Sequence, residues 1–341
     1  MRRWAAGVIM VIFLTLGLAV GQELAQATEI GVDYGPYRLA GQAPGSDIPD
    51  AQLVADLQQI SQKFSYIKTY GSDPVLAKIV PLIQAHNINL KVAVGIYEDD
   101  ANRSGTIAQI NTAIAQAQTY PGIVNMVVVG NECIIGEAPS VPHPVSLSTL
   151  IADLDTVKAA LPTTTVTTGL TYKAGIDLGS STSSLLGHVD NVMVNIYPFY
   201  GGVAIGQSVQ NLVDGIQSFG SYGKPVWVGE TGWPSAGDPI GAAIPSVANE
   251  ETFIMGVINR MQNPQPGDPA CEGVYLFEAY DEPWKTAEGT IGPHWGLWYG
   301  DGSAKFTLAS LPPPVPVPGT LLLTGSGLLG LGLLGWRRKR E

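Results

Sequence analysis

The sequence predicts one α/β domain, residues 28–310, folded as a single (β/α)8 barrel, with a doubly wound open parallel sheet as the alternative. The chain has 341 residues, 45% of them hydrophobic and 14% charged, which suffices for one sizeable core. Short β-branched apolar runs alternate along it with stretches whose apolar residues recur every three and four positions. The segment Gly31-Val32-Asp33-Tyr34-Gly35 is not a GxGxxG fingerprint and is not followed by a helix, so no nucleotide-binding sheet is predicted.

The eight predicted strands are short runs of β-branched and other apolar residues, each bounded by polar or glycine-containing turns. In chain order they are Ile30–Asp33, Tyr66–Thr69, Lys91–Gly95, Val127–Gly130, Thr165–Gly169, Val192–Asn195, Val226–Gly229 and Val274–Phe277. Strand and helix that alternate eight times are typical of a parallel barrel.

The predicted helices are amphipathic stretches between these strands. They are Asp50–Phe64, Pro74–His86, Thr106–Thr119, Ser146–Leu161, Gln207–Phe219 and Ala248–Met261. Asp50 and Ser146 are predicted N-caps, because short polar side chains accept hydrogen bonds from the free amides of a first turn. Pro162 is expected to end the helix before it.

The N-terminus has the pattern of a secretory signal, predicted over residues 1–27. Arg2 and Arg3 precede an apolar run from Val8 to Val20, and the small-residue triplet Ala25-Gln26-Ala27 offers a cleavage site. The alternative is an uncleaved anchor, although the run is shorter than the ~20 apolar residues that span a bilayer.

The C-terminus has a proline-rich linker, residues 311–318, followed by a hydrophobic and then basic tail, residues 319–341. The tail resembles the PEP-CTERM sorting signal of Gram-negative bacteria, which implies export and processing by a membrane sorting protease. Val317 stands between Pro316 and Pro318 where that family usually has Glu. A permanent membrane anchor is the alternative, and both interpretations place the domain outside the cytoplasm, at the cell surface or secreted.

The charge of the chain argues against a nucleic-acid partner. The formal net charge is −11. The two ends together hold six basic and two acidic residues, which leaves 12 basic and 27 acidic residues in the domain between them. Such a domain repels phosphate backbones but not a neutral polysaccharide.

The cysteines and histidines predict no cofactor site. Cys133 and Cys271 are the two cysteines, and their pairing stays open because Cys133 lies beside Glu132 and Cys271 lies in a loop far along the chain. The four histidines are scattered without metal-ligand spacing, so neither a metal nor an organic cofactor is expected.

Two carboxylates follow predicted strands, Glu132 after the fourth and Glu230 after the seventh. In a parallel barrel the chemistry lies at the carboxyl ends of the strands. Cleavage of a glycosidic bond requires two carboxyl groups that face each other, ~5–5.5 Å apart for retention and ~6.5–9.5 Å for inversion. The pattern therefore predicts a glycosidase.

Several segments match one family. Gly130-Asn131-Glu132 and Gly229-Glu230-Thr231-Gly232-Trp233-Pro234-Ser235 resemble the acid/base and nucleophile motifs of glycoside hydrolase family 17. The opening strand, Asn195-Ile196-Tyr197-Pro198-Phe199 and the closing segments Phe277–Lys285 and His294–Leu297 are similar as well. The resemblance covers residues 29–306 and implies a barrel, retention of configuration and a β-1,3-glucan substrate.

The resemblance also implies roles for single residues. Glu132 would be the general acid and base, and Glu230 would be the nucleophile. The pKa of Glu132 is expected to be raised while Glu230 stays ionised, because two close like charges push their pKa values apart. Asn131 would bind the sugar 2-hydroxyl, and Tyr197 would orient Glu230. Glu282 and Lys285 match charged positions that would bind hydroxyls.

Aromatic side chains are expected to form the platforms of a glucan cleft, since sugar rings present apolar faces. The predicted platforms are Tyr34, Tyr70, Trp233, Phe277 and Trp284, of which Tyr34 and Trp233 lie within matched motifs. The family usually has Arg two positions before the tyrosine at position 70, whereas this chain has Lys68, which cannot form the same bidentate fork.

Hydrolysis of β-1,3-glucosidic bonds is thus the predicted function. A transglycosylase would use the same residues and pass the sugar to another hydroxyl instead of to water. A non-catalytic carbohydrate-binding surface protein is the third possibility, but it would have no use for two opposed carboxylates.

Overall fold

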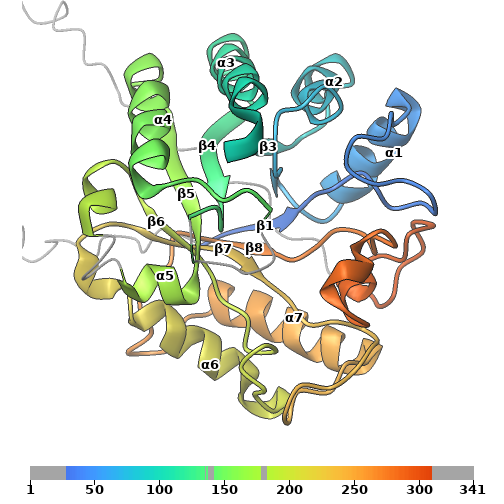
Figure 1. Ribbon diagram of the computed structural model, residues 1–341. Coiled ribbons are helices and arrows are strands. Elements are labelled where there is room, and N and C mark those ends of the chain that lie inside the picture. The colour runs from blue at the N-terminus through green and yellow to red at the C-terminus, as the bar shows by residue number, and fades with distance from the viewer. Residues whose placement is uncertain (1–27, 135, 137–141, 178–182, 309–341) are drawn as a thin grey trace, which may run out of the picture. The chain divides into compact units, whose positions relative to one another are not determined.

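The computed structural model describes residues 28–134, 136, 142–177 and 183–308. Eight parallel strands form one closed barrel in chain order, with the last strand paired to the first (Figure 1). They are β1 (Glu29–Asp33), β2 (Tyr66–Lys68), β3 (Lys91–Ile96), β4 (Val124–Asn131), β5 (Thr165–Thr171), β6 (Val192–Asn195), β7 (Val226–Thr231) and β8 (Gly273–Leu276). The barrel prediction is confirmed, and closure excludes the open sheet.

The predicted signal segment, residues 1–27, and the predicted linker and tail, residues 311–318 and 319–341, lie outside the described residues. Within the described part of the chain, no helix combines the length and the apolar character needed to cross a membrane.

Helices surround the strands in Figure 1, with α1 to α4 on one side and α5 to α7 on the other. Their bounds are α1 (Asp50–Ser61), α2 (Ile79–Ala85), α3 (Arg103–Thr119), α4 (Leu147–Ala160), α5 (Tyr172–Asp177), α6 (Ile205–Gln217) and α7 (Val247–Gln262). The sequence analysis missed α5, whose six residues are too few to show a helical period.

The helix caps correct one prediction and confirm another. Pro49, not Asp50, is the N-cap of α1, so Asp50 is already the first helical residue and places its charge in the first turn. Ser146 caps α4 as predicted, because its hydroxyl accepts from the amide of Thr149. The same helix ends at Ala160, two residues before Pro162.

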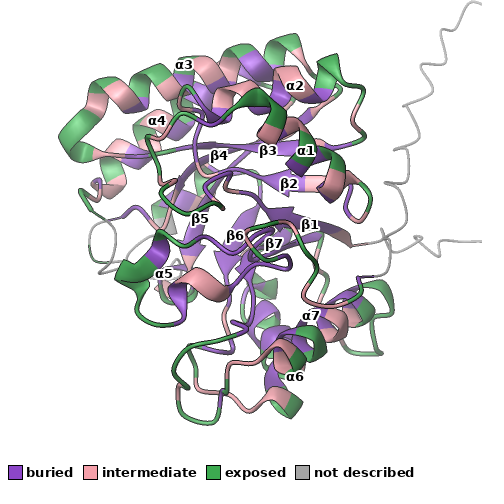
Figure 2. Ribbon diagram, turned by 90° about the vertical axis from the view of Figure 1, so that its right-hand side faces the viewer, coloured by how far each residue is buried: buried purple, intermediate pink, exposed green. Residues whose placement is uncertain are grey.

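The two faces of the strands serve two different cores. One face packs against the helices, and Figure 2 shows the strands buried while the helices expose their outer sides. The other face fills the barrel with a separate cluster of Ala93, Met126, Val128, Met193, Trp227 and Tyr275. Because side chains alternate along a strand, Val32 and Ile67 face the helices, whereas Asp33 and Lys68 face the barrel interior.

The pairing register is irregular near the carboxyl ends of several strands. It shifts between Val128 and Asn131 of β4, and between Val194 and Asn195 of β6. Register shifts of this kind reorient side chains and are frequent next to active sites. They bring Asn195 opposite Glu230 of β7.

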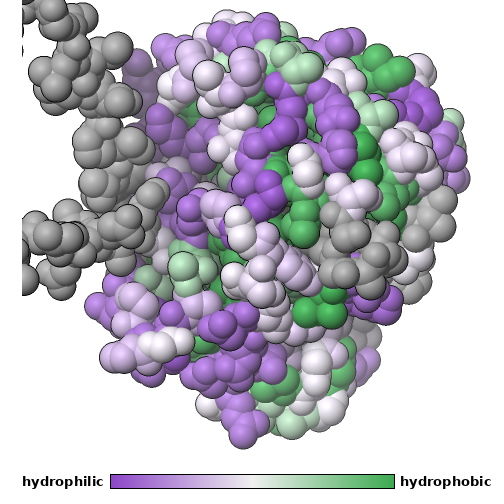
Figure 3. Space-filling view, turned by 90° about the vertical axis from the view of Figure 1, so that its left-hand side faces the viewer, coloured by the Kyte–Doolittle hydropathy of each residue, from purple (hydrophilic) through white to green (hydrophobic). Residues whose placement is uncertain are grey.

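The outer surface has no dominant apolar area on the face shown in Figure 3, where hydrophobic residues lie in small patches among hydrophilic ones. Exposed single apolar residues are normal on a soluble surface.

Candidate active site

Glu132 and Glu230 lie at the carboxyl ends of β4 and β7, as predicted. The chain leaves β4 through a left-handed turn, with φ of 72° at Gly130 and 52° at Glu132. A side-chain carbon at Gly130 would come within 2.4 Å of the Cys133 sulfur, so the turn requires glycine at this position. A non-glycine residue with positive φ is uncommon and often belongs to a functional site.

Three donors hold the Glu230 carboxylate. The Asn131 side-chain amide donates to Oε1 at 3.0 Å, and the Lys68 ammonium donates to the same oxygen at 3.3 Å. The Tyr197 hydroxyl donates to Oε2 at 2.7 Å. Both oxygens are thus bonded, and the nearly buried carboxylate is fixed in one orientation. The predicted contact between Tyr197 and Glu230 is confirmed.

Asn195 links the second carboxylate to the first. Its side-chain amide donates to Oε1 of Glu132 at 2.8 Å and to Oδ1 of Asn131 at 3.3 Å. Since Asn131 also donates to Glu230, one chain of side-chain hydrogen bonds joins Glu230, Asn131, Asn195 and Glu132. The two carboxylates therefore belong to one connected polar network on three strands.

A buried ion pair lies beneath Glu230. Lys68 of β2 and Asp33 of β1 are fully buried, and their charged atoms are 3.1 Å apart. Burial raises the pKa of Asp33 well above its usual range, an effect that Lys68 opposes and Glu230 reinforces. Burial acts to lower the pKa of Lys68, but the charges of Asp33 and Glu230 outweigh it, so that pKa is raised. Lys68 therefore stays cationic between two carboxylates.

Aromatic rings form one wall of the site. Phe277 packs edge-on against Tyr70 and Tyr197, with ring centroids 6.5 and 5.7 Å apart. The Lys68 ammonium lies 4.2 Å from the centre of the Tyr70 ring, within cation–π range. The structure thus brings Tyr70, Tyr197 and Phe277 together around Glu230.

A second buried cation, Lys285, lies against the same wall. Its ammonium is 2.6 Å from Glu278, 3.0 Å from Glu282 and 4.4 Å from the centre of the Phe277 ring. Burial raises the pKa of Glu278 well above its usual range, although Lys285 opposes the effect. Glu282 also accepts from the indole of Trp284, which is at the surface. Glu282 and Lys285 therefore stand next to the predicted site, bonded to each other.

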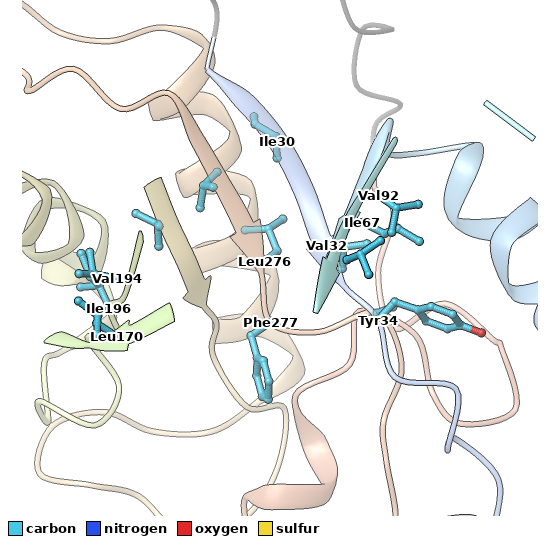
Figure 4. Packing of buried hydrophobic residues seen from close by; sticks show 14 of the residues in the cluster. Ile30, Val32, Tyr34, Ile67, Val92, Leu170, Val194, Ile196, Leu276 and Phe277 are labelled. Carbon is cyan, nitrogen blue, oxygen red and sulfur yellow. The ribbon is translucent and has the colours of Figure 1, made fainter. Parts of the chain in front are cut away.

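Two predicted platforms, Tyr34 and Trp233, lie in the core and offer no open face to a sugar. Both are fully buried, and their polar atoms bond away from Glu230. The Tyr34 hydroxyl donates to Asp56 of α1 at 2.9 Å, and the Trp233 indole donates to the backbone of Ile244. In Figure 4 the rings of Tyr34 and Phe277 leave their strands in different directions. Tyr34 has the parity of Val32 and faces the helices, whereas Trp233 follows the end of β7 and packs on Phe199 and Phe253, so both rings belong to the core.

The sequence analysis missed three site residues. Asp33 and Asn195 end the first and sixth strands, so their position was a usable signal, but no family role drew attention to them. Lys68 was noted only as a departure from Arg, and its contact with Glu230 crosses the barrel from β2 to β7. Such a contact between residues far apart in sequence is set by closure of the sheet.

Cys133 and Cys271 do not form a disulfide with each other. Cys133 follows β4, whereas Cys271 precedes β8, so the two lie at opposite ends of parallel strands. Among the residues that the structure describes, no three His, Cys, Asp or Glu side chains are grouped so as to hold a metal ion. What the site offers is two carboxylates, amide donors, buried ammonium groups and aromatic faces.

Comparison with known families finds one model, described as the BtgE/BtgC glycoside hydrolase domain, that matches residues 31–296. Among curated relatives, the "Probable family 17 glucosidase SCW10" of Saccharomyces cerevisiae is 26% identical over 279 residues, which are 80% of this chain and 65% of that protein. The "Glucan 1,3-beta-glucosidase" of Arthroderma benhamiae is 26% identical over 318 residues, 86% of this chain and 94% of that protein. The "Cell surface mannoprotein MP65" of Candida albicans is 25% identical over 275 residues, 79% of this chain and 66% of that protein. This chain spans less than two thirds of SCW10.

Solved structures share the fold. A family 17 β-1,3-glucanosyltransferase from Rhizomucor miehei has a TM-score of 0.65 at 20% identity, covering 84% of this chain and 99% of that one. An endo-laminarinase from Formosa Hel1_33_131 has a TM-score of 0.69 at 21% identity, covering 84% of this chain and 87% of that one. Both similarities agree with the closed barrel.

Proposed function

This chain belongs to the family of the BtgE/BtgC glycoside hydrolase domain, and on that premise we propose that it cleaves β-1,3-glucosidic bonds in β-glucan with retention of configuration. The observation that carries the proposal is the hydrogen-bonded network that joins Glu230, Asn131, Asn195 and Glu132. It supplies two carboxylates on separate strands, each held by its own donors, as double displacement requires. The name of the relative from Arthroderma benhamiae, a glucan 1,3-beta-glucosidase, supports the β-1,3-glucan substrate.

In the first step Glu230 attacks the anomeric carbon while Glu132 gives its proton to the glycosidic oxygen. The carbon–oxygen bond to the leaving sugar breaks, and an ester forms between the sugar and Glu230. Tyr197 and Lys68 hold the attacking carboxylate, and Asn195 holds the acid. Fixed donors of this kind cost no reorganisation when the charge moves.

In the second step Glu132, now a carboxylate, takes a proton from water, and the water oxygen attacks the anomeric carbon. The ester breaks and Glu230 is released, so two inversions leave the product in the β configuration. Asn131 lies next to Glu230 and is the residue proposed to bind the sugar 2-hydroxyl. Tyr70, Phe277, Glu282 and Lys285 are proposed to line the donor sugar site.

Transglycosylation is the second candidate, supported by the glucanosyltransferase fold neighbour. The ester is the same, but the hydroxyl of another sugar replaces water in the second step. A non-catalytic glucan-binding surface protein remains as the outcome in which neither reaction occurs.

The proposal is tested on a linear β-1,3-glucan oligosaccharide, with anomers followed by NMR and product lengths by mass spectrometry. Shorter β-anomeric products establish a retaining hydrolase, whereas products longer than the substrate establish a transferase. Glu230→Ala should abolish turnover, and Glu251→Ala, an exposed glutamate of α7, is the matched control and should keep it. Glucan binding without turnover in the unchanged protein would instead identify a binding protein.

We also propose that the protein acts outside the cytoplasm, through the signal predicted at residues 1–27, with the tail at residues 319–341 cut by a membrane sorting protease. The cell-surface name of the relative from Candida albicans supports the location. Intact-mass measurement on protein recovered from its native cells tests both ends. A mass that includes either segment would contradict its removal.

A further inference from the structure

Asp33 is a buried carboxylate to which the two proposed steps give no role. It ends β1, and its side chain is fully buried. The Lys68 ammonium lies 3.1 Å from it, and apart from this ion pair neither of its oxygens has a hydrogen-bond partner among the described residues. A buried carboxylate is costly unless a cation or hydrogen-bond donors hold it. Asp33 therefore depends on Lys68.

Lys68 in turn has two anionic partners, and the reaction treats them differently. Its ammonium also lies 3.3 Å from Oε1 of Glu230, and only 1% of the Lys68 side chain is exposed. Glu230 loses its charge when it forms the ester, because one of its oxygens is then bonded to the anomeric carbon. Asp33 forms no bond in either step, so its charge is available throughout.

Without Asp33, the ester would leave the Lys68 cation with no negative partner. The other groups that hold Glu230, Asn131 and Tyr197, are both donors and cannot replace a missing negative charge. A buried charge without a partner is strongly destabilising. With Asp33 ionised, the charges of Lys68 and Asp33 cancel, and the ester forms next to a neutral pair.

The neighbouring charges favour the ionised form of Asp33 in the ester. Burial raises the pKa of this carboxyl, the charge of Lys68 opposes the rise, and the charge of Glu230 adds to it. Formation of the ester removes the contribution of Glu230 and leaves that of Lys68 in place. The pKa of Asp33 should therefore be lower in the ester than in the free enzyme.

We propose that Asp33 is the counter-ion of Lys68 throughout the reaction and that it shifts the balance between free enzyme and glycosyl-enzyme toward the ester. The inference rests on the proposed function. It makes Asp33 a positioning residue, which acts on Glu230 through the shared cation without touching the sugar. Neither Asp33 nor Lys68 gains or loses a proton in either step. The negative charge moves from Glu230 to Glu132 in the first step and returns in the second, so the net charge of the site stays constant.

A slow substrate separates the two steps. The probe is the β-fluoride of a β-1,3-linked glucose disaccharide with fluorine in place of the 2-hydroxyl beside the reacting carbon, since this electron-withdrawing atom disfavours both oxocarbenium-like transition states. In the first step the bond from C1 to fluorine breaks, fluoride leaves and Glu230 bonds to C1. In the second step water attacks C1, its proton passes to Glu132 and the ester breaks. Intact mass measures ester formation after mixing and ester loss after removal of the probe.

Asp33→Asn keeps the shape of the side chain and removes its charge. Ester formation should become slower while ester loss does not, because the ester is the state that loses its counter-ion. The ratio of the two rate constants should fall by about tenfold or more, the effect of one close charge. If the Asn variant does not fold, Asp33→Ser provides the same neutral position with a smaller side chain.

Two further variants show whether the effect depends on this cation. Glu250→Gln is the matched control, because it removes the charge of a buried carboxylate that pairs with Lys305 instead of Lys68. It should keep the ratio within about twofold, since groups that share no partner do not couple. Adding Lys68→Met to Asp33→Asn removes the unbalanced cation, so the ratio should return toward that of the unchanged protein.

A ratio that does not fall in Asp33→Asn overturns the assignment and leaves the proposed function standing, and this includes equal losses in both steps, which indicate a disturbed fold. A double variant whose ratio stays as low as that of Asp33→Asn also overturns it, because the effect then does not depend on Lys68. An unchanged protein that gains no sugar mass on Glu230 overturns the double displacement and this assignment together.

Discussion

The Lys68 ammonium reaches from β2 across the barrel and lies 3.3 Å from Oε1 of Glu230 on β7. Both groups are nearly or fully buried, and Asp33 stands 3.1 Å from the same ammonium on its other side. One cation thus serves two buried carboxylates. Removing one partner of such a group leaves an uncompensated charge and is far more damaging than loss of a surface pair.

Lys68→Met should lower kcat/KM on β-1,3-glucan by about 10²-fold or more, because a charged group that fixes the attacking carboxylate is lost. It should also lower the free energy of unfolding by roughly 3–5 kcal/mol. Lys68→Arg keeps the charge and should retain more of both. Lys63→Met, at a half-buried lysine, is the control. Steady-state kinetics and urea unfolding measure the two effects, and a Lys68→Met enzyme with unchanged kinetics would contradict the assigned role.

Asn195→Ala should impair the step in which Glu132 acts as an acid, because Asn195 donates to Glu132 at 2.8 Å. We expect kcat/KM to fall by about 10²-fold for a substrate with a sugar leaving group, the range of a general acid–base contribution. For the β-fluoride of a β-1,3-linked glucose disaccharide, whose fluoride leaving group needs no proton, the loss should be much smaller. Asn259→Ala, on the exposed side of α7, is the control. Equal losses of kcat/KM on the two substrates would show that Asn195 does not act through Glu132.

Glu98 predicts a specific dependence of stability on pH. Burial and then the charge of Asp153 raise its pKa from 4.5 to about 7, although Arg103 opposes them. Between these two values the folded state binds more protons than the unfolded state, so the free energy of unfolding falls as pH rises through this window. Glu98→Gln cannot titrate and should reduce that fall by on the order of 2 kcal/mol.

Urea unfolding at about pH 4.5 and at pH 7.5 measures the change, with Glu251→Gln as the control at an exposed position. The same fall in the Glu98→Gln protein as in the unchanged one would show that another group causes it. Glu98 also lies close to the turn after β4, since a side-chain carbon at Gly130 would lie 3.0 Å from Cγ of Glu98.

Lys305 should be a determinant of stability, although it lies beyond the residues matched by the family model. Its fully buried ammonium is 2.6 Å from the Ser235 hydroxyl, 2.7 Å from Asp281 and 3.4 Å from Glu250. Lys305→Met leaves two buried carboxylates without their cation and should cost roughly 3–5 kcal/mol of unfolding free energy. Lys173→Met, at an exposed pair with Asp177, should cost under about 1 kcal/mol.

Urea unfolding compares the two variants, and Glu250→Gln is added to Lys305→Met as a double variant. Burial raises the pKa of Glu250 well above its usual range, an effect that Lys305 opposes. The double variant should lose less than the sum of the single losses, because the two groups interact directly. Additive losses would contradict the interaction.

Much of the site followed from the sequence because it lies in local patterns. Val127 to Gly130 and Val226 to Gly229 are buried runs that each end on a carboxylate, so position after a strand located Glu132 and Glu230. The contact of Tyr197 with Glu230 followed from the family resemblance and is present in the structure. The same resemblance nominated Tyr34 and Trp233 as platforms, and the fold buries both.

The sequence by itself determined the eight strands, the parallel barrel and the two carboxylates, because alternating burial and the end of a strand are properties of consecutive residues. Only the tertiary structure decided that Lys68 and Asp33 lie beneath Glu230, that Asn195 joins Glu132 to Asn131, and that Tyr34 is buried in the core. These relationships depend on the register of strands that pair across the closed barrel and on the face each strand turns inward. A shift of one residue would reverse every such face, and the residue that a strand meets on a partner strand cannot be read from one strand alone.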